Sequence, residues 1–171
     1  WLVWRLGRFA ALHPEIEVRL VVTGHSLDIA HSDIDCGIRY GTGPWPGLDS
    51  VLLGGASYSP VAAPTLAARL SQPEDLGQVP VILDQASMLS WANWFAAAGL
   101  AAAPAISGPH YSDPALAFDA AISGQGVLLA VDAMSDDAVR DGRLVRPFPQ
   151  QVRDGLGYWF VWPAGRREPA K

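Results

Sequence analysis

Long hydrophobic runs and cysteine are both scarce in this sequence. Glycine, proline or charge interrupts every apolar stretch well before the roughly 18 residues that a membrane-spanning helix needs. Residues 1–5 lack the charged start, long apolar centre and small-residue cleavage site of a secretory signal. We therefore expect no membrane span and a cytoplasmic location. Cys36 is the only cysteine, which excludes an internal disulfide and favours a buried structural thiol.

Motifs that carry catalytic or metal chemistry are also missing. No glycine-rich phosphate loop opens a helix after a predicted strand, and Gly-x-Ser-x-Gly does not occur. The four histidines have no cysteines at finger spacing, so we expect no metal site. The net charge is −5 and the basic residues are scattered, which argues against direct nucleic-acid binding by this segment. We expect neither an enzyme nor a bound cofactor.

The composition is that of a folded chain. Half of the residues are hydrophobic and 17% are charged, and 171 residues suffice for one domain or for two small lobes. Alternating helical and extended patterns favour an α/β fold with mostly parallel sheets. The predicted helices are 2–12, 27–32, 64–70, 91–98, 114–123 and 136–140. The predicted strands or extended runs are 16–22, 35–40, 51–54, 58–62, 79–83, 106–111, 127–131, 144–148 and 158–162.

Two carboxylates lie where predicted strands end. Asp28 and Asp113 each occupy a loop or helix start after a strand, the side on which α/β sheets bind ligands. Helix capping explains both residues equally well. Among seven tryptophans, Trp91 and Trp94 share one predicted helix and are typical of a core, whereas Trp45 stands in a turn rich in glycine and proline.

Several short motifs, in order along the chain, resemble the effector domain of LysR-type transcriptional regulators. They are Trp-Leu-Val-x-Arg-Leu-x-Arg-Phe at 1–9, His-Pro-Glu-Ile-Glu-Val at 13–18, Asp33–Gly41 with Pro44–Leu48, Pro60–Pro64, Ala117–Gly126, Arg143–Phe148 and Tyr158–Val161. The subgroup that the chain resembles includes the glycine-cleavage activators and the β-lactamase regulators.

The resemblance implies an α/β fold of the periplasmic-binding-protein-like class, type II. Two α/β lobes would be joined by crossover strands, with a ligand cleft between them. Residues 1–58 and 156–171 would form lobe I, and 59–155 would form lobe II. The family's leading strand, winged helix-turn-helix and closing helix are missing from the sequence. We therefore expect lobe I to lack its first strand, and DNA to be contacted only by an N-terminal domain outside this chain.

The resemblance also nominates ligand-binding residues. Asp28 matches a pocket aspartate of the β-lactamase-regulator branch, and Tyr158 matches its tyrosine near the returning strand. That branch has small hydroxyl residues where this chain has Ser112 and Asp113, so one of these two would supply the polar contact. Tyr40, Thr42 and Tyr58 lie where loops or hinge strands would border the cleft, and solvent-facing or core roles are equally open for each of them. The full set of candidates is Thr23, His25, Ser26, Asp28, Tyr40, Gly41, Thr42, Tyr58, Ser112, Asp113 and Tyr158.

The implied function is effector sensing, in which a small molecule shifts an oligomer's arrangement and so controls transcription. We expect an amphoteric ligand, an amino acid or a peptidoglycan fragment, because helix starts attract anions while carboxylates accept hydrogen bonds from amines. The resemblance implies a homodimer through 2–12 and 114–123, and a tetramer in the full-length protein. The alternatives are a transporter's solute-binding protein, which would carry an export signal, and an enzyme of this fold such as a deaminase, which would need a catalytic residue.

Overall fold

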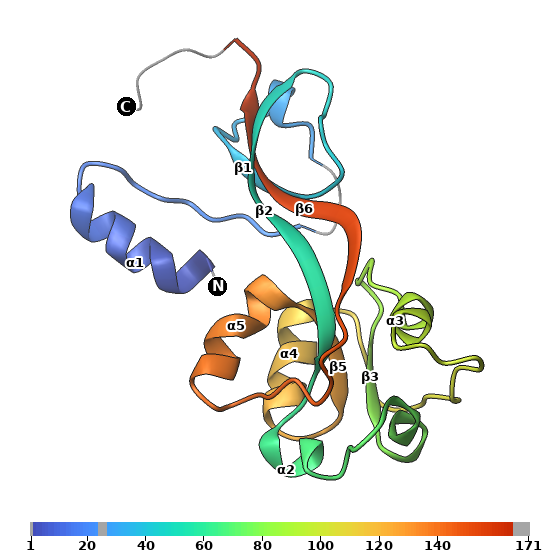
Figure 1. Ribbon diagram of the computed structural model, residues 1–171. Coiled ribbons are helices and arrows are strands. Elements are labelled where there is room, and N and C mark those ends of the chain that lie inside the picture. Colours follow the sequence, from blue (N-terminus) through green and yellow to red (C-terminus); the bar gives the residue numbers. More distant parts are fainter. Residues whose placement is uncertain (1, 24–26, 166–171) are drawn as a thin grey trace. The chain divides into compact units, whose positions relative to one another are not determined.

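The computed structural model describes residues 2–23 and 27–165 (Figure 1). The chain divides into two compact units. Unit 1 comprises Trp1–Gly55 and Gly155–Lys171, and unit 2 comprises Ala56–Asp154. Within the described ranges, no helix combines the length and the apolar character that crossing a membrane requires.

Unit 1 begins with the predicted helix and includes an antiparallel strand pair. Its elements are α1 (Leu2–Leu12), the 3-10 helix η1 (Ile29–His31), β1 (Gly37–Gly41), the first part of β2 (Leu48–Val61) and most of β6 (Val152–Pro163). Helix α1 ends just before Pro14, because proline disfavours helical geometry at the residue preceding it. Strands β1 and β6 pair from Gly37↔Val161 to Gly41↔Gly157.

The strand predicted for residues 16–22 is wrong. These residues form no helix or strand, and Val22 is 87% exposed. An alternating apolar pattern becomes a strand only when a neighbouring strand satisfies its backbone groups. No strand pairs with this segment anywhere in the part of the chain that the structure describes.

Unit 2 combines strands with helices that connect them. Its elements are the second part of β2, α2 (Pro64–Ala67), the 3-10 helix η2 (Pro73–Gln78), β3 (Val81–Asp84), α3 (Trp91–Ala97), β4 (His110–Tyr111), α4 (Pro114–Ile122), β5 (Val127–Val131) and α5 (Asp132–Arg140). The order across the whole sheet is β1-β6-β2-β5-β3-β4. Figure 1 shows α4 and α5 beside β5.

The sheet is mixed, where the sequence favoured a mostly parallel one. Strand β3 runs parallel to β4 and β5, whereas β2 runs antiparallel to β5. The segments from β3 to β4 and from β4 to β5 contain α3 and α4, and such crossovers produce parallel neighbours. Strand β2 is one uninterrupted strand, not the two short runs predicted at 51–54 and 58–62.

Smaller differences lie at the ends of the predicted elements in unit 2. The extended run predicted at 106–111 contributes only the two residues of β4, and the run at 144–148 contributes only the isolated bridge Ala62↔Val145. Helix α5 starts at Asp132, four residues before its predicted start, and η2 was not predicted. Periodicity carries little signal at the ends of helices and strands, where the backbone often changes to 3-10 or irregular geometry.

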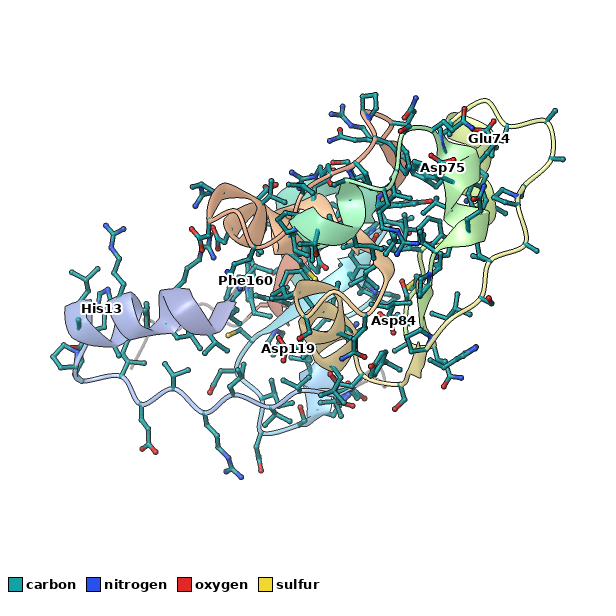
Figure 2. All side chains as sticks on the ribbon, turned by 90° about the horizontal axis from the view of Figure 1, so that it is seen from below. His13, Glu74, Asp75, Asp84, Asp119 and Phe160 are labelled. Atoms are coloured by element: carbon teal, nitrogen blue, oxygen red, sulfur yellow. The ribbon has the colours of Figure 1, made fainter. Side chains whose placement is uncertain are left out.

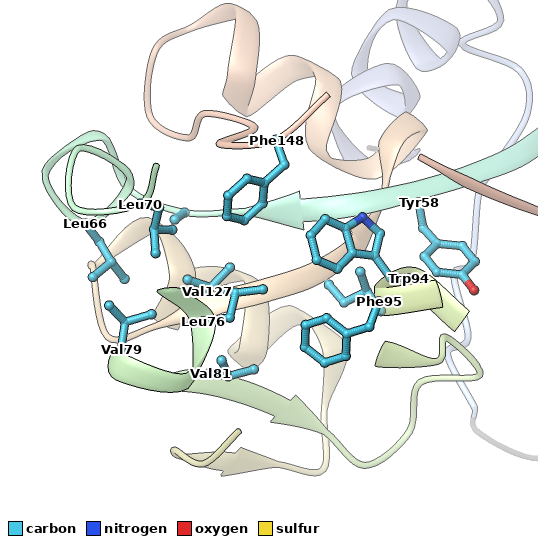
Figure 3. Packing of buried hydrophobic residues seen from close by; sticks show 12 residues of the cluster. Tyr58, Leu66, Leu70, Leu76, Val79, Val81, Trp94, Phe95, Val127 and Phe148 are labelled. Atoms are coloured by element: carbon cyan, nitrogen blue, oxygen red, sulfur yellow. The ribbon is translucent and has the colours of Figure 1, made fainter. Parts of the chain in front are cut away.

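The core of unit 2 gathers around Trp94, which is fully buried (Figure 3). Its ring lies 5.4 Å from that of Phe148 and 5.6 Å from that of Phe95, measured between centroids. The indole Nε1 donates a hydrogen bond to the carbonyl oxygen of Gln150 at 3.0 Å, so the one polar atom of the side chain is satisfied. The core assignment of Trp94 is therefore confirmed.

A buried charge joins β2 to the start of α5. Asp132 is 8% exposed and accepts hydrogen bonds from the hydroxyls of Ser57 at 2.5 Å and Ser59 at 2.6 Å. The Arg146 Nε donates to the same carboxylate at 3.1 Å, and its Nη2 donates to Asp136 at 2.7 Å. Both oxygens of the Asp132 carboxylate are thus occupied within unit 2, as a buried charge requires.

Candidate functional site

Polar residues gather at the carboxyl edge of the parallel strands in unit 2. Strands β3 and β4 end side by side at the pair Asp84↔Tyr111, and Ser112 and Asp113 follow directly (Figure 2 labels Asp84). The Asp113 Oδ1 accepts hydrogen bonds from the backbone N–H of Ala115 at 2.8 Å and of Leu116 at 3.3 Å. Asp113 therefore caps α4, which was one of its two predicted roles, and it stays exposed beside Ser112.

Asp84 belongs to this edge, although it was not among the ligand-binding residues predicted from the sequence. Partial burial raises the pKa of its carboxyl group, and the nearby Asp113 carboxylate raises it further, although a hydrogen bond from the Ala86 N–H opposes both effects. The same strand-end rule that selected Asp113 applies to Asp84, which ends β3. The signal was present, because the strand predicted at 79–83 ends directly before Asp84.

Replacing Asp84 with asparagine is expected to raise the Tm at pH 7. With the pKa raised in the folded state, the unfolded chain loses its proton first as the pH rises, so ionisation of Asp84 costs folding stability. Asparagine can still accept the hydrogen bond from Ala86 and carries no charge. The gain over the wild type should shrink as the pH falls through the pKa of Asp84, and thermal unfolding between pH 3 and pH 7 measures it. A gain that does not change with pH would contradict this account.

In unit 1, two candidate tyrosines face each other across the β1–β6 pair. Tyr40 and Tyr158 are direct partners in the register, and their ring centroids lie 5.0 Å apart. Burial raises the pKa of the Tyr158 hydroxyl, so it remains a neutral hydrogen-bonding group at physiological pH. Gly41, at the end of β1, is half-buried, and Thr42 beside it is exposed. The strand pairing thus brings four of the candidates into one region of unit 1.

Asp28 lies at the start of η1 and is exposed. The His31 Nδ1 lies 2.9 Å from its Oδ2, and this hydrogen bond holds the pKa of Asp28 below its usual value. Asp28 therefore stays ionised at neutral pH and is accessible to a ligand. Thr23 is exposed in the irregular segment before it, while His25 and Ser26 lie outside the described residues.

Tyr58 has the core role that the sequence left open, whereas Cys36 lies elsewhere than the sequence suggested. Tyr58 is fully buried in the apolar cluster of unit 2, where it pairs with Val131 on β5, so its surroundings are those of a core residue. Cys36 was expected to be buried, and that expectation is wrong, because the residue is exposed just before β1 begins. In the described ranges, no three His, Cys, Asp or Glu side chains lie close enough to hold a metal ion.

The LysR substrate binding domain model matches residues 1–171, and the chain belongs to this family. It is 37% identical to the HTH-type transcriptional activator AmpR of Rhodobacter capsulatus, over 97% of this chain and 56% of that protein. It is 38% identical to the glycine cleavage system transcriptional activator of Escherichia coli K12, over 100% of this chain and 57% of that protein. The chain thus spans little more than half the length of these curated relatives.

Solved structures of AmpR effector domains are also similar to this chain. The effector domain of AmpR of Pseudomonas aeruginosa matches with a TM-score of 0.79 at 34% identity, over 99% of this chain and 82% of that chain. The AmpR effector binding domain from Citrobacter freundii matches with a TM-score of 0.80 at 28% identity, over 98% and 84%. The α/β fold of the type II periplasmic-binding-protein-like class is confirmed. The relatives are transcriptional activators, neither enzymes nor transporter components.

Proposed function

We propose that this chain senses a small-molecule effector within a LysR-type transcriptional regulator. The observation that carries the proposal is the similarity, along the whole chain, to two transcriptional activators and to effector domains of AmpR. DNA contact would be made by another part of such a protein, in keeping with the net charge of −5 on this segment. A role in transcription would place the protein in the cytoplasm.

Units 1 and 2 would then be the two lobes, each with its own ligand-binding residues. Unit 2 would contribute Asp84, Ser112 and Asp113 at the carboxyl edge of its parallel strands. Unit 1 would contribute Asp28 and the region of Tyr40, Gly41, Thr42 and Tyr158. The lobe boundaries drawn from the sequence stay a prediction.

The carboxylates favour a ligand with an ammonium or hydroxyl donor. Asp28 is exposed and ionised, and Asp84 and Asp113 add two further acceptors in unit 2. An amino acid or a peptide-bearing peptidoglycan fragment combines such donors with carboxylates of its own. An amino acid would also suit a protein similar to a glycine cleavage system activator.

The chain would act as a homodimer, with a tetramer in the full-length protein. Helices α1 and α4, the two elements proposed to form the dimer contact, each carry large apolar side chains that are exposed. Leu12 of α1 is 66% exposed and Leu116 of α4 is 56% exposed. A ligand that prefers one arrangement of the oligomer would shift its population and so change how the DNA-binding domains are presented.

Replacing Asp28 with alanine is expected to weaken effector binding by about 10- to 100-fold, the equivalent of one charge-assisted hydrogen bond. The measurement is isothermal titration of the full-length protein with a panel of amino acids and muropeptides. Asp33→Ala is the matched control, because Asp33 is an exposed carboxylate in the same segment.

The outcomes separate the site from the function. If a compound binds and only Asp28→Ala loses affinity, both sensing and the site are supported. If a compound binds the two variants equally well, sensing stands and Asp28 is not a ligand contact. If no member of the panel binds the wild-type protein, the proposed ligand class fails.

A further inference from the structure

Arg39 and Trp159 lie on the face of the β1–β6 pair opposite the two tyrosines. They are direct partners in the register, one position away from the Tyr40↔Tyr158 pair. Because side chains alternate along a strand, the tyrosines point to one face while Arg39 and Trp159 point to the other. Neither Arg39 nor Trp159 is a ligand candidate, yet both reach segments that carry candidates.

Trp159 holds the turn that follows β1. Its Nε1 donates a hydrogen bond to the carbonyl oxygen of Gly41 at 3.0 Å. Its ring also covers Gly43, where an added Cβ would lie 3.1 Å from the indole and where φ is +51°. Only glycine combines this backbone geometry with so close an approach. Trp45, further along the same turn, meets Trp159 edge-on, with ring centroids 6.0 Å apart and an interplanar angle of 83°.

Arg39 connects this turn to the segment that carries Asp28. Its guanidinium lies over the ring of Trp45, with Cζ 5.6 Å from the centroid, in the geometry of a cation–π interaction. Its Nη2 donates a hydrogen bond to the carbonyl oxygen of Leu27, the residue before Asp28. Arginine suits this task because its planar group can stack on an indole and still donate in its own plane.

We propose that Arg39, Trp45 and Trp159 form a positioning cluster that holds the Asp28 segment and the Gly41–Thr42 turn in one fixed arrangement. None of the three is a ligand contact. The cluster acts through the backbone of Leu27 and of Gly41, so the candidate ligand groups are in place before a ligand arrives. The proposal rests on the proposed function, because that function makes the two segments part of a binding site.

The expected effects are local. A hydrogen bond contributes about 0.5–1.5 kcal/mol and a cation–π contact about 0.5–1 kcal/mol, so removing the hydrogen bond should raise local opening by about three- to tenfold and removing the cation–π contact by about two- to fivefold. Amide hydrogen exchange of the full-length protein, read peptide by peptide, reports this opening directly. Exchange of the β5 amides in unit 2 serves as the internal standard for global stability.

Trp159→Phe removes the indole N–H and keeps an aromatic ring. We expect exchange across residues 41–47 to accelerate by about three- to tenfold, with β5 unchanged. Trp162→Phe is the matched control, because Trp162 lies on the same strand and faces the opposite side from Trp159. If the two variants exchange alike over 41–47, the cluster does not hold the turn and the proposal is overturned.

Arg39→Met keeps an unbranched apolar side chain and removes the donors and the charge of the guanidinium. We expect faster exchange in residues 27–32 as well as in 41–47, whereas Arg8→Met, which changes an exposed arginine of α1, should alter neither. If Arg39 only stabilised β1, its replacement would leave amide exchange in residues 27–32 unchanged. Unchanged exchange there would therefore contradict a link between Arg39 and that segment. No ligand enters either experiment. The titration can therefore contradict the proposed function while the exchange data support the cluster. Equally, the exchange data can contradict the cluster while the titration supports the function.

Discussion

Replacing Asp132 with alanine is expected to lower the free energy of unfolding by about 3–5 kcal/mol. The change strips two serine hydroxyls and the Arg146 guanidinium of a shared acceptor in a place where water has little access. The Arg146 side chain is only 22% exposed, so its charge would be left partly desolvated. The cost comes mainly from the donors that lose their shared acceptor, although the Arg146 Nη2 keeps its hydrogen bond to Asp136 at 2.7 Å.

Asp136 provides the matched control. It binds the same guanidinium at 2.7 Å, but its side chain is 53% exposed. Asp136→Ala should therefore cost no more than about 1 kcal/mol, since water replaces an exposed partner. Urea unfolding followed by far-ultraviolet circular dichroism compares the two variants. Equal losses would mean that burial of the Asp132 carboxylate does not determine its contribution.

Truncating Trp94 to alanine is expected to cost about 3–5 kcal/mol as well, for a different reason. The indole fills the centre of the apolar cluster between Phe95 and Phe148, and its removal leaves a cavity that rigid neighbours cannot close. The hydrogen bond to the carbonyl oxygen of Gln150 is lost at the same time.

Trp94→Phe separates the two contributions. Phenylalanine keeps most of the apolar volume and lacks the N–H donor, so we expect a loss of about 1–2 kcal/mol. The same urea titration measures both variants. If phenylalanine proved as damaging as alanine, the hydrogen bond and not the packing would dominate at this position.

The elements predicted best are those whose own residues decide their structure. Residues 127–131 form β5 with the predicted bounds, because an apolar run that ends at glycine on one side and at a buried aspartate on the other has few alternatives. Helix α1 also matches its prediction. Residues 16–22 fail because a strand depends on a neighbour, and sequence periodicity contains no information on whether that neighbour is there.

The candidate site was predictable in part. Asp113 caps α4, which was one of the two roles predicted for it, and its ligand-binding role beyond the end of a strand stays a prediction. Cys36 was misplaced because an apolar neighbourhood in sequence does not imply burial when the residue precedes its strand. The support from Arg39 and Trp159 could not be foreseen, because it depends on the antiparallel register between strands far apart in the chain.

The division of the chain also sets an order for its synthesis. All of unit 2 lies between residues 56 and 154, so its strands and helices can assemble as soon as that stretch has left the ribosome. Strand β1 is made early, but its partners at 157–161 emerge only afterwards. The nascent chain therefore carries an unpaired β1 throughout the production of unit 2, a period in which a chaperone that shields strand edges would protect it most.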